Sequence, residues 1–148
     1  VENFISINTP SRLLIHYKNI SSLDFKVFKI DQNQMDRFTS LRKDSERVGF
    51  IDDLPVEKQW NSILKTENDY QEHSTEVLLP ALNSGRYMIV SHKKDQFKKE
   101  KIYAYAFVQV TDISLVRMND PKLEIWQAIN RNTGKPIKNT KIHAKSET

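Results

Sequence analysis

Apolar and polar residues alternate in several short segments, which is typical of half-buried β-strands. In the first of these, residues 12–17, the apolar side chains fall on one face. In the next, residues 24–30, they fall on both faces. The polar stretch 18–22 between the two segments has the character of a hairpin loop. We therefore expect the chain to open with a β-hairpin.

The spacing of apolar residues then becomes helical. A sparse helical stripe runs from Met35 to Val48, with Gly49 as its expected end. A second helix, capped by Asp53, is expected to follow because apolar residues recur at helical spacing at Val56, Trp60, Ile63 and Leu64. Trp60 is expected to anchor this helix to the sheet. The pattern predicts a helical insertion at about 35–66, which either packs on the sheet or reaches a partner.

The strand pattern returns after residue 69. Strands are expected at 75–79 and, after a turn at 83–85, at 86–91. Residues 101–110 are apolar on both faces, with Ile102, Ala104, Ala106, Val108 and Val110 on one side. A strand of this kind is expected to be covered on both sides, by the helical insertion or by a neighbouring domain.

Aromatic residues gather on the other face of the 101–110 strand. Tyr103, Tyr105 and Phe107 lie there at alternate positions. Such a stripe is either a sugar-binding platform or a packing surface. We favour packing, and we expect these three residues and Trp126 to bury against a neighbouring domain.

The last third of the chain has a pattern of its own. Strands are predicted at 113–118 and 122–129, joined by a turn at 119–121. A loop at 130–136 precedes a weaker expected strand at 137–144. Three strands make a thin unit by themselves. They either complete the first sheet or begin a second domain.

The composition is ordinary for a packed globular protein, with 38% hydrophobic and 28% charged residues. No apolar run approaches the roughly 20 residues that span a bilayer, and we expect any export signal to have been removed or left out. The absence of cysteine excludes disulfides and thiolate chemistry. The last eighteen residues hold five Lys or Arg and one Glu, so their net charge of +4 equals that of the whole chain. We interpret the basic stretches as solvated surface and predict no nucleic-acid partner.

No grouping of residues points to catalysis. The paired acids Asp52 and Asp53 fit helix capping better than acid–base chemistry. The histidines fall in different predicted elements, without metal-ligand spacing, at His16, His73, His92 and His143. We therefore predict no catalytic, cofactor-binding or metal-binding residue, no cofactor, and no enzyme activity. The alternative enzyme would need a site assembled in space from scattered His and acidic residues.

Four stretches resemble motifs of macroglobulin domains. Leu79–Tyr87 resembles the pattern L-P-x-L-x-x-G-x-Y, and Tyr105–Leu115 resembles a V-T-D-L-x-L crossover into a following domain. Trp126–Ile137 resembles the hairpin W-V-x-x-x-x-T-G-K-P-V. Tyr17–Ile20 with Phe25–Lys29 resembles the R-N-v … v-Y-r opening hairpin.

The chain therefore resembles the bacterial alpha-2-macroglobulin-like proteins, particularly the large Bacteroidetes-type forms. The resemblance covers about residues 10–30 and 70–148 and leaves out the helical insertion. It implies a mainly β fold, an immunoglobulin-like, macroglobulin β-sandwich with a helical insertion. It also implies one such domain at 1–110 and the first strands of a following macroglobulin-like domain at 111–148.

The same resemblance implies a role. Members of this family are large extracytoplasmic chains that trap proteases, and some carry a Cys–Gln thioester, which a cysteine-free chain cannot contain. By resemblance, this chain is a non-catalytic structural segment of such an endopeptidase inhibitor, in the periplasm or associated with the outer membrane. Its expected partners are neighbouring macroglobulin-like domains and, through the parent protein, proteases. The alternative is a free-standing β-sandwich module for adhesion or carbohydrate binding.

Overall fold

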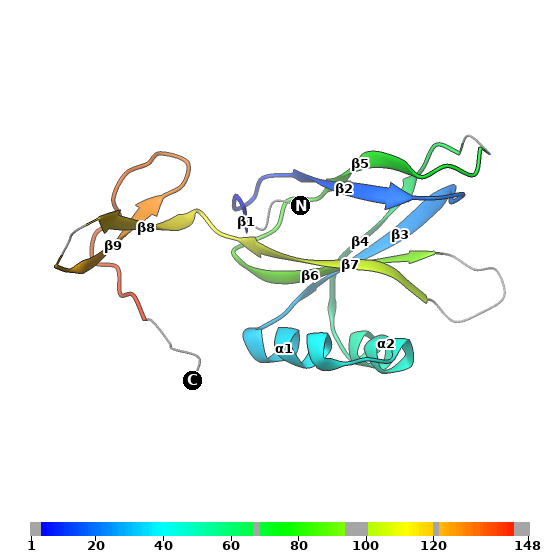
Figure 1. Cartoon of the computed structure of the whole chain (residues 1–148), viewed down its shortest axis with the longest axis horizontal. Helices are drawn as coiled ribbons and strands as arrows, with labels where there is room; N and C mark the ends of the chain where they lie inside the picture. Colours follow the sequence, from blue (N-terminus) through cyan, green and yellow to red (C-terminus); the bar gives the residue numbers. More distant parts are fainter. Residues whose placement is uncertain (1–3, 67–68, 94–100, 120–121, 144–148) are drawn as a thin grey trace. The chain divides into compact units, whose positions relative to one another are not determined.

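The structure, a computed structural model, describes residues 4–66, 69–93, 101–119 and 122–143. The chain divides into two compact units, Val1–Val110 and Thr111–Thr148. Figure 1 shows helices and two sheets in the first unit and a β-hairpin in the second. Within the part of the chain that the structure describes, no helix is long and apolar enough to cross a membrane.

A five-stranded sheet forms the centre of the first unit. Its strands, in spatial order, are β1 (Phe4–Ile5), β7 (Lys101–Val110), β6 (Gly85–Lys93), β3 (Ser22–Lys29) and β4 (Val56–Ile63). Neighbouring strands run antiparallel, except that β1 runs parallel to β7. Phe4 and Ile5 pair with the edge of β7, opposite Gln109 and Val110.

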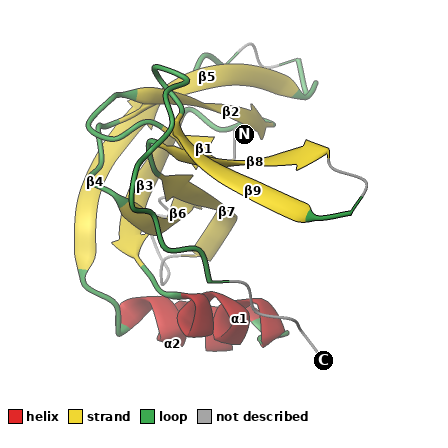
Figure 2. Cartoon of the chain, turned by 90° about the vertical axis from the view of Figure 1, so that its left-hand side faces the viewer, coloured by secondary structure: helices red, strands yellow, loops and turns green. Residues whose placement is uncertain are grey.

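Two further layers cover this sheet. β2 (Ser11–Tyr17) and β5 (His73–Leu79) pair antiparallel as a separate two-stranded sheet. Figure 1 shows this small sheet over one face of the five-stranded sheet, with α1 (Gln32–Ser40) and α2 (Asp44–Asp52) below the other face. The turned view in Figure 2 shows the same order of layers. The fold is therefore a mainly β sandwich with a helical insertion, as the sequence predicted.

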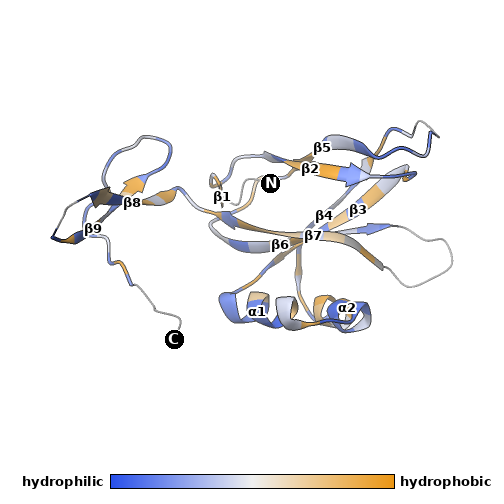
Figure 3. Cartoon of the chain, viewed as in Figure 1, coloured by the Kyte–Doolittle hydropathy of each residue, from blue (hydrophilic) through white to orange (hydrophobic). Residues whose placement is uncertain are grey.

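Each pair of layers encloses its own hydrophobic core. β6 supplies both cores, because Tyr87 and Ile89 face the small sheet while Met88 and Val90 face the helices. This explains its uninterrupted apolar sequence. Figure 3 shows hydrophobic stretches on β2 and β3. The core beneath the helices contains the buried side chains Phe28, Ile30, Phe38, Ile51, Met88 and Val90.

The predicted single helix at 35–48 is wrong, because the chain forms two shorter helices there. Asp31 begins α1 through a capping box, in which its carboxylate accepts from the Gln34 N–H at 2.7 Å. The backbone leaves the helical conformation at Leu41, and α2 then starts at Asp44. Gly49 lies inside α2 and does not end it. Both helices pack on the sheet, which resolves the question that the sequence left open.

The predicted second helix at 53–64 is also wrong. Residues Val56–Ile63 form β4, which pairs antiparallel with β3. The apolar residues used for the helical stripe do not share a face, since Trp60 packs into the core while Ile63 is 88% exposed. A set of four apolar residues over nine positions fits either period, and pairing with β3 decides between them.

The predicted opening hairpin is wrong as well, although both of its strands exist. β2 pairs with β5 and β3 pairs with β4 and β6, so residues 18–21 cross from one sheet to the other. Ile20 in this connection is buried in the core between the sheets. Burying Ile20 and the inner face of β2 favours this crossing over a hairpin in which β2 would lie beside β3.

Strands expected at 75–79, 86–91 and 101–110 are confirmed. One detail of the last strand is wrong. The register of β6 and β7 shifts between Ser91 and His92, so that Ile102 packs with the core under the helices. Ile102 therefore leaves the face on which simple alternation placed it.

The second unit is a β-hairpin of β8 (Ile113–Asn119) and β9 (Glu124–Asn130). The expected turn residues Asp120 and Pro121 lie outside the described residues. The weaker strand expected at 137–144 is wrong for residues 137–143, which form no strand, and residue 144 is not described. Instead, Ile137 donates its N–H to the Ala128 carbonyl at 2.9 Å, next to a single bridge between Ile129 and Pro136.

Candidate functional site

The aromatic stripe of β7 belongs to the contact between sheet and helices. The ring of Phe38 in α1 lies 5.0 Å from that of Tyr105 and 6.1 Å from that of Phe107, measured between centroids. The Arg47 guanidinium lies 5.6 Å from the Tyr105 ring centroid. The helical insertion therefore covers Phe107 and part of Tyr105, which remains 40% exposed. Burial of the exposed part of Tyr105 against a neighbouring domain stays a prediction. The side chain of Tyr103 lies outside what the structure describes.

The histidines do not form a common site. His16 on β2 lies 3.7 Å from the Glu72 carboxylate, and His73 at the start of β5 lies 2.9 Å from that of Asp69. His92 is buried in β6, and His143 follows the hairpin in the second unit. Among the residues that the structure describes, no group of three or more His, Asp or Glu could hold a metal ion.

The Asp69–His73 pair is a local structural feature. The hydrogen bond from His73 is the main cause that lowers the pKa of Asp69, and the Gln71 N–H donates to the same carboxylate oxygen at 2.9 Å. The Tyr17 ring lies 5.9 Å from the His73 ring, and its hydroxyl donates to the Lys65 carbonyl at 2.8 Å. These contacts attach both ends of the 65–73 connection to β2 and β5.

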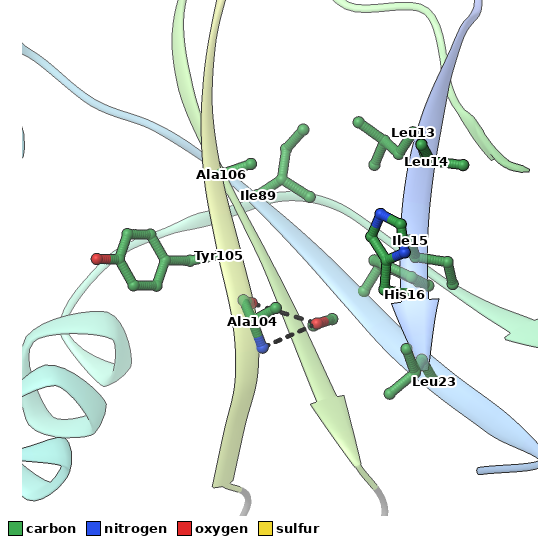
Figure 4. A pocket seen from close by; sticks show the side chains of 11 residues that line it. Leu13, Leu14, Ile15, His16, Leu23, Ile89, Ala104, Tyr105 and Ala106 are labelled. Atoms are coloured by element: carbon green, nitrogen blue, oxygen red, sulfur yellow. Dashed lines mark hydrogen bonds between the residues drawn. The ribbon is translucent and has the colours of Figure 1, made fainter. Parts of the chain in front are cut away.

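An apolar cavity of about 250 Å³ opens between β2 and β7 (Figure 4). Leu23, Phe25, Ile89 and Ser91 of β3 and β6 contribute to its lining. The Ser91 hydroxyl is already engaged, since it donates to the Ala104 carbonyl at 3.2 Å and accepts from its N–H at 3.1 Å. The cavity thus offers mainly apolar side chains to an occupant.

The β8–β9 hairpin exposes apolar side chains on both of its faces. Leu115 lies opposite Ala128 and is 49% exposed, while Met118 lies opposite Ile125 on the other face and is also 49% exposed. Trp126 shares the face of Leu115 and is 46% exposed. A two-stranded hairpin with two apolar faces cannot cover either of them with its own residues.

Comparison with known proteins identifies the architecture. No protein-family model and no curated protein sequence matches the chain. A solved structure of native alpha-2-macroglobulin from Escherichia coli, spanning domains MG0-NIE-MG1, superimposes with a TM-score of 0.56 at 14% sequence identity. The match covers 85% of this chain and 41% of that chain, so this chain spans less than half the length of its structural neighbour. The chain has a macroglobulin-like fold.

In this macroglobulin-like fold, the residues of the Leu79–Tyr87 motif build the corner between β5 and β6. Leu79 and Tyr87 are both buried in the core between the sheets. The Tyr87 hydroxyl donates to the Asn83 carbonyl at 3.0 Å, and burial raises the pKa of Tyr87. Gly85 has a φ of +157°, and a Cβ there would lie 2.9 Å from the Lys29 Cε. The motif therefore specifies the corner.

The Trp126–Ile137 motif contains a turn that the sequence only outlined. The Asn130 side-chain oxygen accepts from the N–H groups of Asn132 at 3.0 Å and Thr133 at 2.9 Å. Gly134 follows with a φ of +69°, a conformation that favours glycine. Sequence reasoning placed the loop correctly but missed the role of Asn130. An Asn at the start of a Thr-Gly turn was the available signal.

Proposed function

We propose that this chain is a non-catalytic structural segment of a larger alpha-2-macroglobulin-like protein. In this proposal the parent protein is extracytoplasmic, in the periplasm or at the outer membrane, and acts in protease trapping. Residues 1–110 form one macroglobulin-like domain, and residues 111–148 supply the first strands of the next. The macroglobulin-like fold supports this assignment, and the sequence resemblance adds the Bacteroidetes-type family.

The observation that carries the proposal is the pair of apolar faces on the β8–β9 hairpin. Fully burying a side chain such as Leu115 or Met118 stabilises a protein by about 1.5–3 kcal/mol relative to leaving it exposed. Hydrophobic residues on both faces of one hairpin therefore call for two covering layers. Further strands of a macroglobulin-like domain would cover one face, and an adjacent domain would cover the other.

An immunoblot of fractionated source cells tests this proposal, using an antibody raised against the fragment. We expect a band far larger than 17.4 kDa in the envelope fraction. A band at 17.4 kDa would contradict the structural-segment reading. A large band confined to the cytoplasm would support a long parent chain but would refute its extracytoplasmic setting.

The alternative of a free-standing carbohydrate-binding module depends on an exposed aromatic surface. Tyr105 and Phe107 pack against Phe38, which leaves Tyr105 40% exposed and Phe107 half-buried. Trp126, which is 46% exposed, is the tryptophan whose fluorescence can report such binding. Saturable quenching of tryptophan fluorescence by a glycan, lost in Trp126→Ala, would favour the alternative over the structural role.

A further inference from the structure

We draw no further inference here: the strongest candidate, the apolar cavity between β2 and β7, opens at the edge of β7 in line with β1, and nothing in the residues that the structure describes shows what covers it there.

Discussion

Phe25 and Trp60 lie directly opposite each other on β3 and β4, with ring centroids 5.0 Å apart and ring planes 10° apart. Phe25 is buried, and Trp60 covers it from the edge strand of the sheet. A cross-strand aromatic pair of this kind contributes more than its buried area alone. This contact fixes the register in which β4 joins the sheet.

Replacing Trp60 tests whether residues 56–63 form a strand. We expect Trp60→Ala to lower the free energy of unfolding by about 2–4 kcal/mol, because it removes the stacked ring and opens the core beside Phe25. Ile63→Ala is the control from the same strand. Ile63 is 88% exposed, so we expect a change within about 0.5 kcal/mol. Urea denaturation of both variants measures these values. Equal losses would indicate that Trp60 and Ile63 share one buried face, as in the predicted helix.

The contrast between Trp60 and Ile63 shows where sequence reasoning reached its limit. Apolar residues on both faces of the segments placed β6 and β7 correctly, because each of these strands contributes side chains to both cores. β4 is mostly exposed and carries few apolar residues, so its period was ambiguous. The partner of β2 was also hidden, because a polar connection at 18–21 is compatible with a hairpin and with a crossing between sheets. Strand pairing depends on residues far apart in the sequence, and local spacing does not encode it.

Gly85 and Gly49 form a matched pair for the role of glycine. At Gly85 the φ of +157° is unfavourable for other residues, whereas the Lys29 Cε, 2.9 Å from an added Cβ, belongs to a flexible side chain that can move aside. We expect Gly85→Ala to lower the free energy of unfolding by at least about 1 kcal/mol. Gly49 lies within α2 with nothing within 4 Å of an added Cβ. Gly49→Ala is expected to stabilise the fold by about 0.5–1 kcal/mol.

Thermal unfolding followed by circular dichroism checks both glycine variants. A rise in the melting temperature for Gly85→Ala would contradict the strained corner between β5 and β6. A large loss for Gly49→Ala would contradict the open environment of α2.

Asp69 gives the fold a pH dependence of defined sign. Its pKa is lowered in the folded state from the ordinary value of 3.8, chiefly by the hydrogen bond from His73. The ionised carboxylate therefore stabilises the fold above pH 3.8, and this contribution disappears as the pH falls through the folded-state pKa. Asp69→Asn removes the titrating group. We expect the stability difference between wild type and Asp69→Asn to shrink as the pH falls from 6 to below 3.

Denaturation midpoints at a series of pH values measure that difference. Asp44→Asn, at an exposed position in the first turn of α2, is the control for removal of one negative charge elsewhere. A difference for Asp69→Asn that stays constant across the acid range would contradict the assigned role of the His73 hydrogen bond.

The cavity between β2 and β7 was beyond the reach of the sequence for a different reason. Ala104 and Ala106 were assigned to one face of a strand, which is confirmed. These alanines border a cavity because β2 lies across from them. The sequence instead predicts that β2 forms a hairpin with the following strand. The expected aromatic surface likewise required the position of Phe38 to be known. In both cases the missing information was the spatial neighbour of a correctly placed strand.

Cutting the chain between Val110 and Thr111 tests the assignment of the two units. Every residue of both core clusters in the first unit lies between Ile5 and Val110. We therefore expect residues 1–110 alone to unfold in one cooperative transition. The 111–148 peptide has a two-stranded hairpin with apolar residues on both faces, so we expect no cooperative transition and no strand spectrum in circular dichroism. A cooperatively folded 111–148 peptide would contradict the proposal that these residues are only the first strands of a larger domain.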